Sequence, residues 1–199
     1  MRPNNRPQKG STIKVEPIRE LKDIRLIKKL LADRPRDLAI FTLGVNTNLR
    51  AGDLVRITAD QVRHLQPGEY FTIREQKTGK LREVTLNKNV HEALQGLLRT
   101  MPVAAGPDEA VLFQSRKGRQ ALCVSYLNSL VKTWCREVNL KGNFGSHTLR
   151  KTFGYIHRTV FNTDIPTLMQ MFNHSSQKQT LAYLGIQPGE IKDAYLKDI

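Results

Sequence analysis

Apolar residues recur at helical spacing along most of the chain. The stretch PIRELKDIRLIKKLLADR, residues 17–34, has them three or four positions apart, which predicts an amphipathic helix. A second helix is expected to begin at Pro35, since proline favours the first helical position, and to end near Asn46. A third, short helix is predicted from Ala51 to Ile57.

The segment EYFTIREQKTGKLREVTL has the period of strands instead. Two runs rich in β-branched and aromatic residues, Tyr70–Glu75 and Leu81–Leu86, flank a polar turn around Thr78 and Gly79. This arrangement predicts a β-hairpin. We expect one more strand near Val62–Leu65, which would complete a small three-stranded sheet.

Helical patterns return after Asn87. Long helices are predicted in NKNVHEALQGLLR, in ALCVSYLNSLVKTWCREVNL and in SHTLRKTFGYIHRTVF, the last with Ser146 as its N-cap. Shorter helices are expected at Ile165–Phe172, Ser176–Tyr183 and Pro188–Lys197. The pattern as a whole predicts a mainly α fold with a small antiparallel β-sheet, in the α+β class.

The chain divides into a short arm and one body. Residues 1–16 contain prolines, a glycine and several basic residues with almost nothing to bury, so we expect a basic, flexible N-terminal arm. Residues 17–199 are expected to form the body, including a C-terminal helix. The start lacks the apolar core of a signal peptide, and no apolar run approaches the roughly 20 residues of a membrane span. We therefore expect a cytoplasmic protein.

The charge is strongly positive. The chain has 32 Lys and Arg against 18 Asp and Glu, a formal net charge of +14. A balance this basic favours a polyanionic partner, usually nucleic acid, because Lys and Arg that contact phosphates release counterions. A membrane surface is the alternative, but no basic amphipathic helix with exposed Trp or Phe stands out.

Motifs for cofactors and metals are absent from the sequence. It has neither a GxxxxGK[ST] phosphate loop nor a GxGxxG fingerprint, so no nucleotide cofactor is expected. Cys123 and Cys135 lack CxxC spacing, and the five histidines show no close pairing with Cys, Asp or Glu. We therefore expect reduced thiols and no metal site.

Cationic and imidazole side chains recur at the ends of the predicted elements. Arg50 precedes the third helix, Lys77 is at the hairpin tip, and His174 follows a helix. His147 and Arg150 are three residues apart and share a helix face. Each alone is typical of a solvated charge or a capping group, but together they indicate a phosphate site.

Five blocks of the sequence resemble the catalytic domain of the tyrosine recombinase, or phage integrase, family. TNLRAGDLVRI resembles the family's first-arginine segment, REQKTGKLREVTL its lysine-bearing hairpin, and SHTLRKTF its H-x-x-R segment. FNHSSQKQTLAYLGI resembles the segment with the final histidine and, nine residues later, the nucleophilic tyrosine. The blocks follow the family's order between about residues 17 and 190. The resemblance implies the tyrosine recombinase catalytic-domain fold and a site-specific DNA recombinase that works through a 3′-phosphotyrosine without a cofactor.

The resemblance also implies how the strand is broken. Tyr183 is the nucleophile that attacks the scissile phosphate. His147 is the general base or orienting partner, because a tyrosine with an ordinary pKa of about 10 must lose its proton to react. Lys77 protonates the leaving 5′ oxygen.

Other catalytic residues that the resemblance implies neutralise the charge on the phosphate. Arg50 and Arg150 bind the non-bridging oxygens with their planar guanidinium groups, and His174 adds a hydrogen bond. Asp53 fits the family's acidic position and is expected to aim or buffer the arginines. Asn48 replaces the family's usual glycine before the leucine that precedes the first arginine, and asparagine tolerates a left-handed backbone there.

For two of the catalytic residues that the resemblance implies, other residues of the same type are also candidates. Lys80 also lies on the hairpin and could replace Lys77. Tyr155 and Tyr195 compete with Tyr183 on residue type, and only the spacing from the final histidine selects Tyr183.

The expected partner is double-stranded DNA, bound by a homotetramer on two sites, with room for accessory DNA-bending proteins in the nucleoid. Most members of the family carry an N-terminal DNA-clamping domain. Here only residues 1–16 precede the body, as in the short recombinases that invert fimbrial promoter segments. Three alternatives stay open: a non-catalytic DNA-binding regulator of the same fold, a monomeric type IB topoisomerase, and a fragment of a longer recombinase.

Overall fold

Helix α2, Pro35–Asn46, is the buried centre of the fold. Residues 39–45 are all buried, and the helix packs against α5, Lys88–Leu98, and α7, Ser146–Thr159. This is a computed structural model, which describes residues 15–101, 110–115, 118, 120–184, 192 and 195–198. The predicted start and end of α2 are confirmed, with Pro35 in the first turn.

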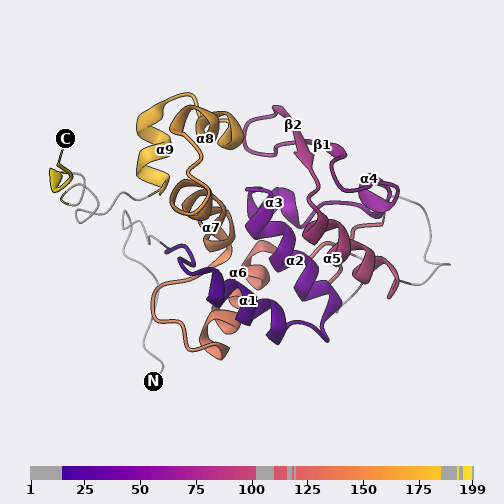
Figure 1. Cartoon of the computed structure of the whole chain (residues 1–199). Helices are drawn as coiled ribbons and strands as arrows, with labels where there is room; N and C mark the ends of the chain where they lie inside the picture. Colours follow the sequence, from indigo (N-terminus) through magenta and orange to yellow (C-terminus); the bar gives the residue numbers. More distant parts are fainter. Residues whose placement is uncertain are drawn as a thin grey trace, which may run out of the picture.

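The remaining helices lie on several sides of α2, two of them beyond α7 (Figure 1). They are α1 (Leu21–Leu30), α3 (Ala51–Leu54), α4 (Ala59–Arg63), α6 (Val124–Glu137), α8 (Ile165–Phe172) and α9 (Gln177–Leu184). With the hairpin, they confirm the predicted mainly α fold with a small antiparallel sheet. The predicted arm falls almost wholly outside the described residues, as does most of the predicted helix at Pro188–Lys197. None of the described helices is long and apolar enough to cross a membrane.

The strand predicted near Val62–Leu65 is wrong, because Val62 and Arg63 are the last residues of helix α4 and His64 is its C-cap. A capping box begins the helix: the Thr58 side chain accepts from the third helical N–H, and the Thr58 N–H donates to Gln61 Oε1 at 3.0 Å. This local pairing satisfies amides that a strand would leave for a neighbour. In the described part of the chain the sheet therefore has two strands.

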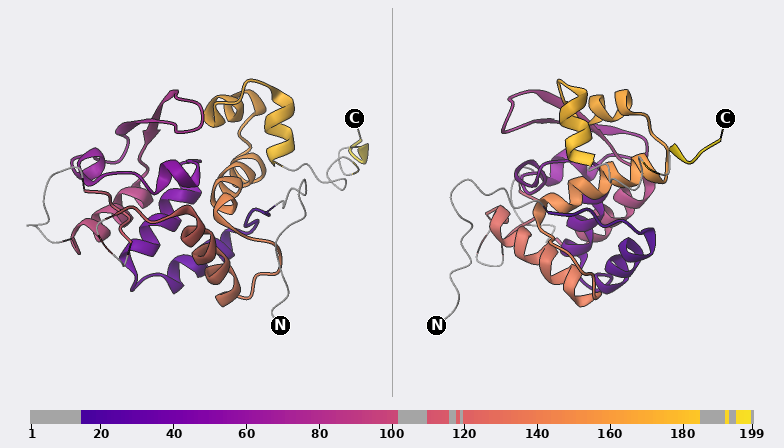
Figure 2. Two further views of the ribbon diagram at one scale, coloured as in Figure 1. Left: turned by 180° about the vertical axis from the view of Figure 1, so that it is seen from behind. Right: turned by 90° about the vertical axis from the view of Figure 1, so that its left-hand side faces the viewer.

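The predicted hairpin is confirmed. Strands β1 (Tyr70–Arg74) and β2 (Leu81–Thr85) are antiparallel. In the turn between them, Gly79 has a φ of 69° and donates its N–H to the Glu75 carbonyl at 2.8 Å. A φ of this sign favours glycine. Figures 1 and 2 show the turn end of the hairpin beside α8.

Helix α7 joins two apolar clusters. Leu149 belongs to the large cluster around α2. Phe153, one turn later, belongs to a small cluster with Leu168 and Phe172 of α8 and Leu184 of α9. Arg150 lies between these two positions on α7. Its charged group is therefore at the junction of the two apolar clusters.

Candidate active site

The start of α7 sets the positions of His147 and Arg150. Ser146 does not cap the helix as predicted, because Gly145 is the N-cap and Ser146 the first helical residue. The Ser146 N–H donates to Asn128 Oδ1 of α6 at 3.0 Å. A Cβ at Gly145 would lie 2.3 Å from the same oxygen. A side chain from α6 therefore caps α7, and the close approach requires glycine.

Arg150 is buried, with 3% of its surface exposed. Its guanidinium donates to the backbone carbonyls of Asn48, at 2.5 Å, and Phe172, at 3.1 Å. These carbonyls hold the group in place without neutralising it. Burial, with the like charges of Arg50 and Arg82, lowers the pKa of Arg150 to about 10, so it stays a cation at neutral pH. The result is a fixed positive charge available to an anion.

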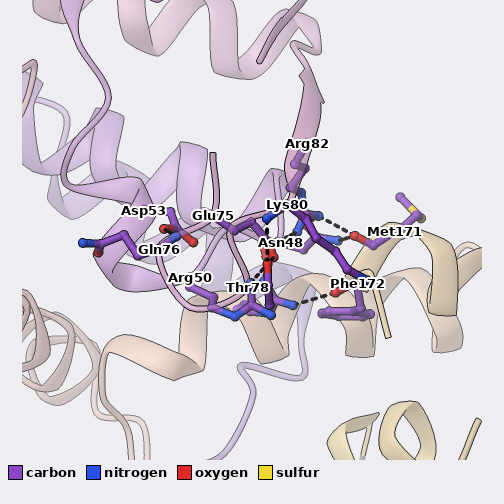
Figure 3. A network of polar contacts seen from close by, with 11 residues as sticks. Asn48, Arg50, Asp53, Glu75, Gln76, Thr78, Lys80, Arg82, Met171 and Phe172 are labelled. Carbon is purple, nitrogen blue, oxygen red and sulfur yellow. Dashed lines mark hydrogen bonds and ion pairs between the residues drawn. The ribbon is translucent and has the colours of Figure 1, made fainter. Parts of the chain in front are cut away.

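Arg50 is the N-cap residue of α3. Its Nη1 lies 2.6 Å from Glu75 Oε2, at the end of β1. Asn48, two residues earlier, has a φ of 49°, so the predicted left-handed turn is confirmed. That turn lets the carbonyl of Asn48 reach Arg150, while Arg50 lies beside Glu75 and Thr78 of the hairpin (Figure 3).

His174 follows α8. Its ring stacks on Phe172 at 5.2 Å between centroids, and its Nδ1 lies 3.0 Å from Thr180 Oγ1 on α9. Burial, followed by the charges of Arg150 and Arg50, lowers the pKa of His174 to about 4. The imidazole is therefore neutral at pH 7. When the Thr180 hydroxyl donates to Nδ1, the proton of the ring is on Nε2, where it can be donated to a ligand.

Tyr183 of α9 lies against this histidine and Arg150. Its ring centroid is 5.9 Å from that of His174 and 5.9 Å from the Arg150 guanidinium carbon. Its hydroxyl is buried and has no hydrogen-bond partner of acceptable geometry among the described residues. Burial raises the pKa of Tyr183 to about 12, although the nearby Arg150 charge opposes the rise.

The competing tyrosines lie elsewhere. The ring of Tyr155 is 5.9 Å from the guanidinium of Arg19, and Tyr195 is 87% exposed. The geometry therefore favours Tyr183, in agreement with the choice made from its spacing.

The charge of Lys77 on the hairpin turn acts on the imidazole of His147 at the start of α7. Both are solvent-exposed at the residue level. Desolvation of the imidazole, followed by the charges of Arg150, Lys151, Lys77 and Arg50, lowers the pKa of His147. A nearly neutral imidazole can accept a proton. The influence of Lys77 on this ring favours Lys77 over Lys80 as the hairpin lysine of the site.

Asp53 contacts the hairpin backbone. Its buried carboxylate accepts the N–H of Gln76 at 3.0 Å, whereas Glu75 supplies the carboxylate that pairs with Arg50. Sequence reasoning missed Glu75. The available signal was strand alternation, because Phe71 and Ile73 face inward and Glu75 continues that register.

Metal-binding groups are not part of the site. Among the described residues, no group of three or more His, Cys, Asp or Glu side chains could hold a metal ion. Cys123 is exposed and Cys135 is buried, and both are free thiols. The chemistry available here is that of a tyrosine hydroxyl, two imidazoles and fixed cations.

Comparison with known proteins gives relatives of one kind. The sequence profile of the phage integrase family matches residues 20–189. The probable integrase/recombinase YoeC of Bacillus subtilis (strain 168) is 30% identical over 182 residues, covering 91% of this chain and 95% of YoeC. Tyrosine recombinase XerC of Caldanaerobacter subterraneus subsp. tengcongensis is 30% identical over 177 residues, covering 86% of this chain and 48% of XerC. The chain thus spans nearly all of one relative and about half of the other.

Solved structures agree with the sequence relatives. XerA recombinase superposes with a TM-score of 0.73 at 20% identity, covering 92% of this chain and 65% of XerA. XerH site-specific recombinase in its post-cleavage complex has a TM-score of 0.73 at 19% identity, covering 96% of this chain and 55% of XerH. The catalytic domain of bacteriophage HP1 integrase has a TM-score of 0.59 at 21% identity, covering 92% and 94%. The chain therefore belongs to the phage integrase family of tyrosine-type site-specific recombinases, and its fold is that of their catalytic domain.

Proposed function

We propose that this chain cuts and rejoins double-stranded DNA at specific sites through a covalent 3′-phosphotyrosine at Tyr183. The observation that carries the proposal is the position of Tyr183, packed against Arg150 and His174 from two other parts of the chain. A tyrosine buried for packing alone has no need of a desolvated cation beside it. A phosphoryl transfer site needs both a nucleophile and fixed positive charge.

In the first step a bond forms between the Tyr183 oxygen and phosphorus, and the bond from phosphorus to the 5′ oxygen breaks. The tyrosine proton passes to His147, and Lys77 supplies a proton to the departing 5′ oxygen. One phosphodiester is exchanged for another, so the 5′ hydroxyl of a different strand can reverse the step. Rejoining therefore requires no nucleotide hydrolysis.

The charge of the transition state is stabilised by Arg50, Arg150 and His174, which bind the non-bridging oxygens. In this proposal the Thr180 hydroxyl donates to Nδ1 of His174, and the neutral ring donates through Nε2. Asp53 holds the backbone of the hairpin that carries Lys77. Phosphate binding by preorganised donors costs little reorganisation when the reaction occurs.

The partner in this proposal is duplex DNA, bound by four copies of the chain on two sites. The net charge of +14 supports a polyanionic partner. XerH was solved on its difH DNA and the Tn1549 integrase on a circular intermediate DNA, which supports the same class of ligand here. Affinity should fall steeply with salt, as it does when phosphate contacts release counterions.

Covalent trapping tests the proposal. The protein is mixed with fragmented bacterial DNA and denatured, and the protein-linked DNA is recovered and sequenced. We expect adducts concentrated at a few loci for the wild type and for Tyr155→Phe, and none for Tyr183→Phe. Adducts from Tyr183→Phe would contradict the assignment of the nucleophile.

The same samples distinguish the alternative functions. Relaxation of an arbitrary supercoiled plasmid by dilute protein, without paired sites, would indicate a topoisomerase. DNA binding without adducts from any variant would indicate a regulator of the same fold. Strand exchange that depends on two copies of a recovered locus is the result expected of a recombinase.

A further inference from the structure

The carboxylate of Glu75 connects Arg50 to the turn of the hairpin. Its Oε2 lies 2.6 Å from Arg50 Nη1. The same oxygen accepts a hydrogen bond from the Thr78 hydroxyl at 2.6 Å. Thr78 directly follows Lys77, the proposed acid for the leaving group. One oxygen atom therefore contacts both the phosphate-binding arginine and the residue next to the acid (Figure 3).

Glu75 is suited to a fixed position because it is buried and ionised. Only 1% of its surface is exposed. Burial opposes its ionisation, but hydrogen bonds from Thr78 and Arg50, the Arg50 charge and a hydrogen bond from Arg82 together lower its pKa to about 2. An ionised carboxylate with these partners has little freedom to reorient.

The second oxygen extends the network toward Arg150. Glu75 Oε1 accepts from Arg82 Nη1 at 3.1 Å. Arg82 Nη2 donates to Asn48 Oδ1 and to the Met171 carbonyl, and the Asn48 backbone carbonyl accepts from Arg150. Contacts thus run continuously from the hairpin turn to Arg50 and to Asn48 (Figure 3), and from Asn48 to Arg150.

We propose that Glu75 is a positioning residue that couples Arg50 to the hairpin turn, so that Lys77 is held over the phosphate that Arg50 binds. This proposal rests on the function proposed above and adds a residue to it. Arg50 and Lys77 are both cations and repel each other, and Lys77 is exposed on a turn. A carboxylate bound to Arg50 and to Thr78 offsets that repulsion and limits the conformations of the turn.

The alternative role for Glu75 is that its ion pairs only stabilise the fold. The two roles differ in how they depend on the leaving group. A thiol has a pKa near the 8.5 of cysteine, far below that of an alcohol, so a 5′-thiolate leaves without a proton. A defect that arises because Lys77 is misplaced should therefore shrink when the 5′ bridging oxygen is replaced by sulfur, whereas a folding defect should not.

The experiment measures single-turnover covalent attachment on two duplexes that contain a locus recovered by trapping. One has the natural phosphate and the other a 5′-bridging sulfur. The variants are Glu75→Gln and Thr78→Val, and the matched control is Glu83→Gln, which removes the same charge from an exposed position of the same hairpin. Thr78 is also exposed, so Thr78→Val remains informative if Glu75→Gln folds poorly.

On the natural duplex we expect attachment to slow about 100-fold for Glu75→Gln and about 10-fold for Thr78→Val, within the range of general acid catalysis. On the sulfur duplex the Glu75→Gln defect should fall to about 10-fold, because Arg50 still lacks its carboxylate partner. Thr78→Val should react like the wild type on this duplex. Glu83→Gln should stay within about twofold on both. Equal defects on the two duplexes, or natural cleavage at the wild-type rate, would overturn the proposal.

Hydrogen exchange tests the coupling without DNA. We expect Glu75→Gln to speed exchange at the Gly79 and Lys80 amides of the turn about tenfold or more, while Glu83→Gln leaves them unchanged. Unchanged exchange in Glu75→Gln would overturn the proposal. If the wild type attaches to neither duplex, the proposed function fails, and this measurement still decides whether Glu75 holds the turn.

Discussion

The guanidinium carbon of Arg150 lies 5.9 Å from the centroid of the Tyr183 ring and 5.0 Å from that of Phe172. This relationship brings α7, α8 and α9 together around one buried cation. It also places the proposed nucleophile beside the arginine proposed to bind phosphate, in the protein without DNA. Because burial raises the pKa of Tyr183 to about 12, the hydroxyl stays protonated and covered in the free protein. In the proposed mechanism, DNA binding therefore has to expose this oxygen and bring a base to it.

Replacing Tyr183 by Phe should stabilise the protein while it removes the chemistry. The hydroxyl is buried, and in the described residues its interaction with Arg150 does not have good hydrogen-bond geometry, so its loss removes a desolvation cost that is only partly compensated. We expect the free energy of unfolding in urea to rise by about 1 kcal/mol. A decrease of similar size would show that the hydroxyl is bonded in solution.

Arg150→Lys should lose activity although it keeps the charge. A single ammonium cannot contact the Asn48 and Phe172 carbonyls and still present a planar pair of donors to phosphate. We expect the single-turnover attachment rate to fall about 10²- to 10³-fold. The exposed Arg136→Lys on α6 is the control and should react like the wild type. Activity within tenfold of wild type for Arg150→Lys would contradict the assigned role.

Gly154→Ala should disturb the helix that carries Tyr183. A Cβ at Gly154 would lie 2.7 Å from Leu184 Cδ2 of α9 and 2.7 Å from Phe172 Cζ. Overpacking of this kind costs about 1–3 kcal/mol, and displacement of α9 should also slow attachment.

At Gly96 of α5 an added Cβ meets nothing within 4 Å. Gly96→Ala should therefore stabilise the protein by about 0.5–1 kcal/mol in thermal unfolding. Equal effects at both glycines would argue against the described packing.

Acid should weaken the fold through His174. The folded state holds this imidazole neutral with a pKa of about 4, below the ordinary 6.5, so between these values the unfolded chain binds more protons. The contribution of the neutral His174 ring to the free energy of unfolding is complete above pH 6.5 and is lost as the pH falls to about 4. We expect it to amount to about 1–2 kcal/mol after solvent screening.

The measurement is urea unfolding of the wild type and of His174→Gln at several pH values between 7 and 4. Because His147 and His157 also have lowered pKa values, only the difference between the two proteins isolates His174. That difference should diminish as the pH falls. A difference that is constant with pH would show that His174 titrates normally. The exposed His64→Gln serves as the control.

Much of the secondary structure was predictable because its causes are local. The proline that begins α2, the alternation in β1 and β2, and the left-handed turns at Asn48 and Gly79 all depend on neighbours in sequence. The prediction of a strand at Val62–Leu65 was wrong, also because of a local interaction. A capping box at Thr58 satisfied the backbone locally, and this determined helix over strand.

The order and types of the reactive side chains were also readable from the sequence. Spacing selected Tyr183 over Tyr155 and Tyr195, and the geometry favours the same residue. The carboxylate partner of Arg50 was not readable. Asp53, three residues after Arg50, was expected to aim or buffer the arginines, but the carboxylate that pairs with Arg50 is that of Glu75 at the end of β1, whose Oε2 lies 2.6 Å from Arg50 Nη1.

The sequence by itself determined most of the helices, the hairpin and the identities of the residues proposed to carry the chemistry, since these depend on period, caps and residue type. Only the tertiary structure decided which carbonyls hold Arg150, which carboxylate binds Arg50, and how far burial moves the pKa values of His174 and Tyr183. The physical reason is distance. Hydrogen bonds, ion pairs and desolvation depend on atoms a few ångströms apart that belong to segments far apart in the chain, and no local pattern encodes those separations.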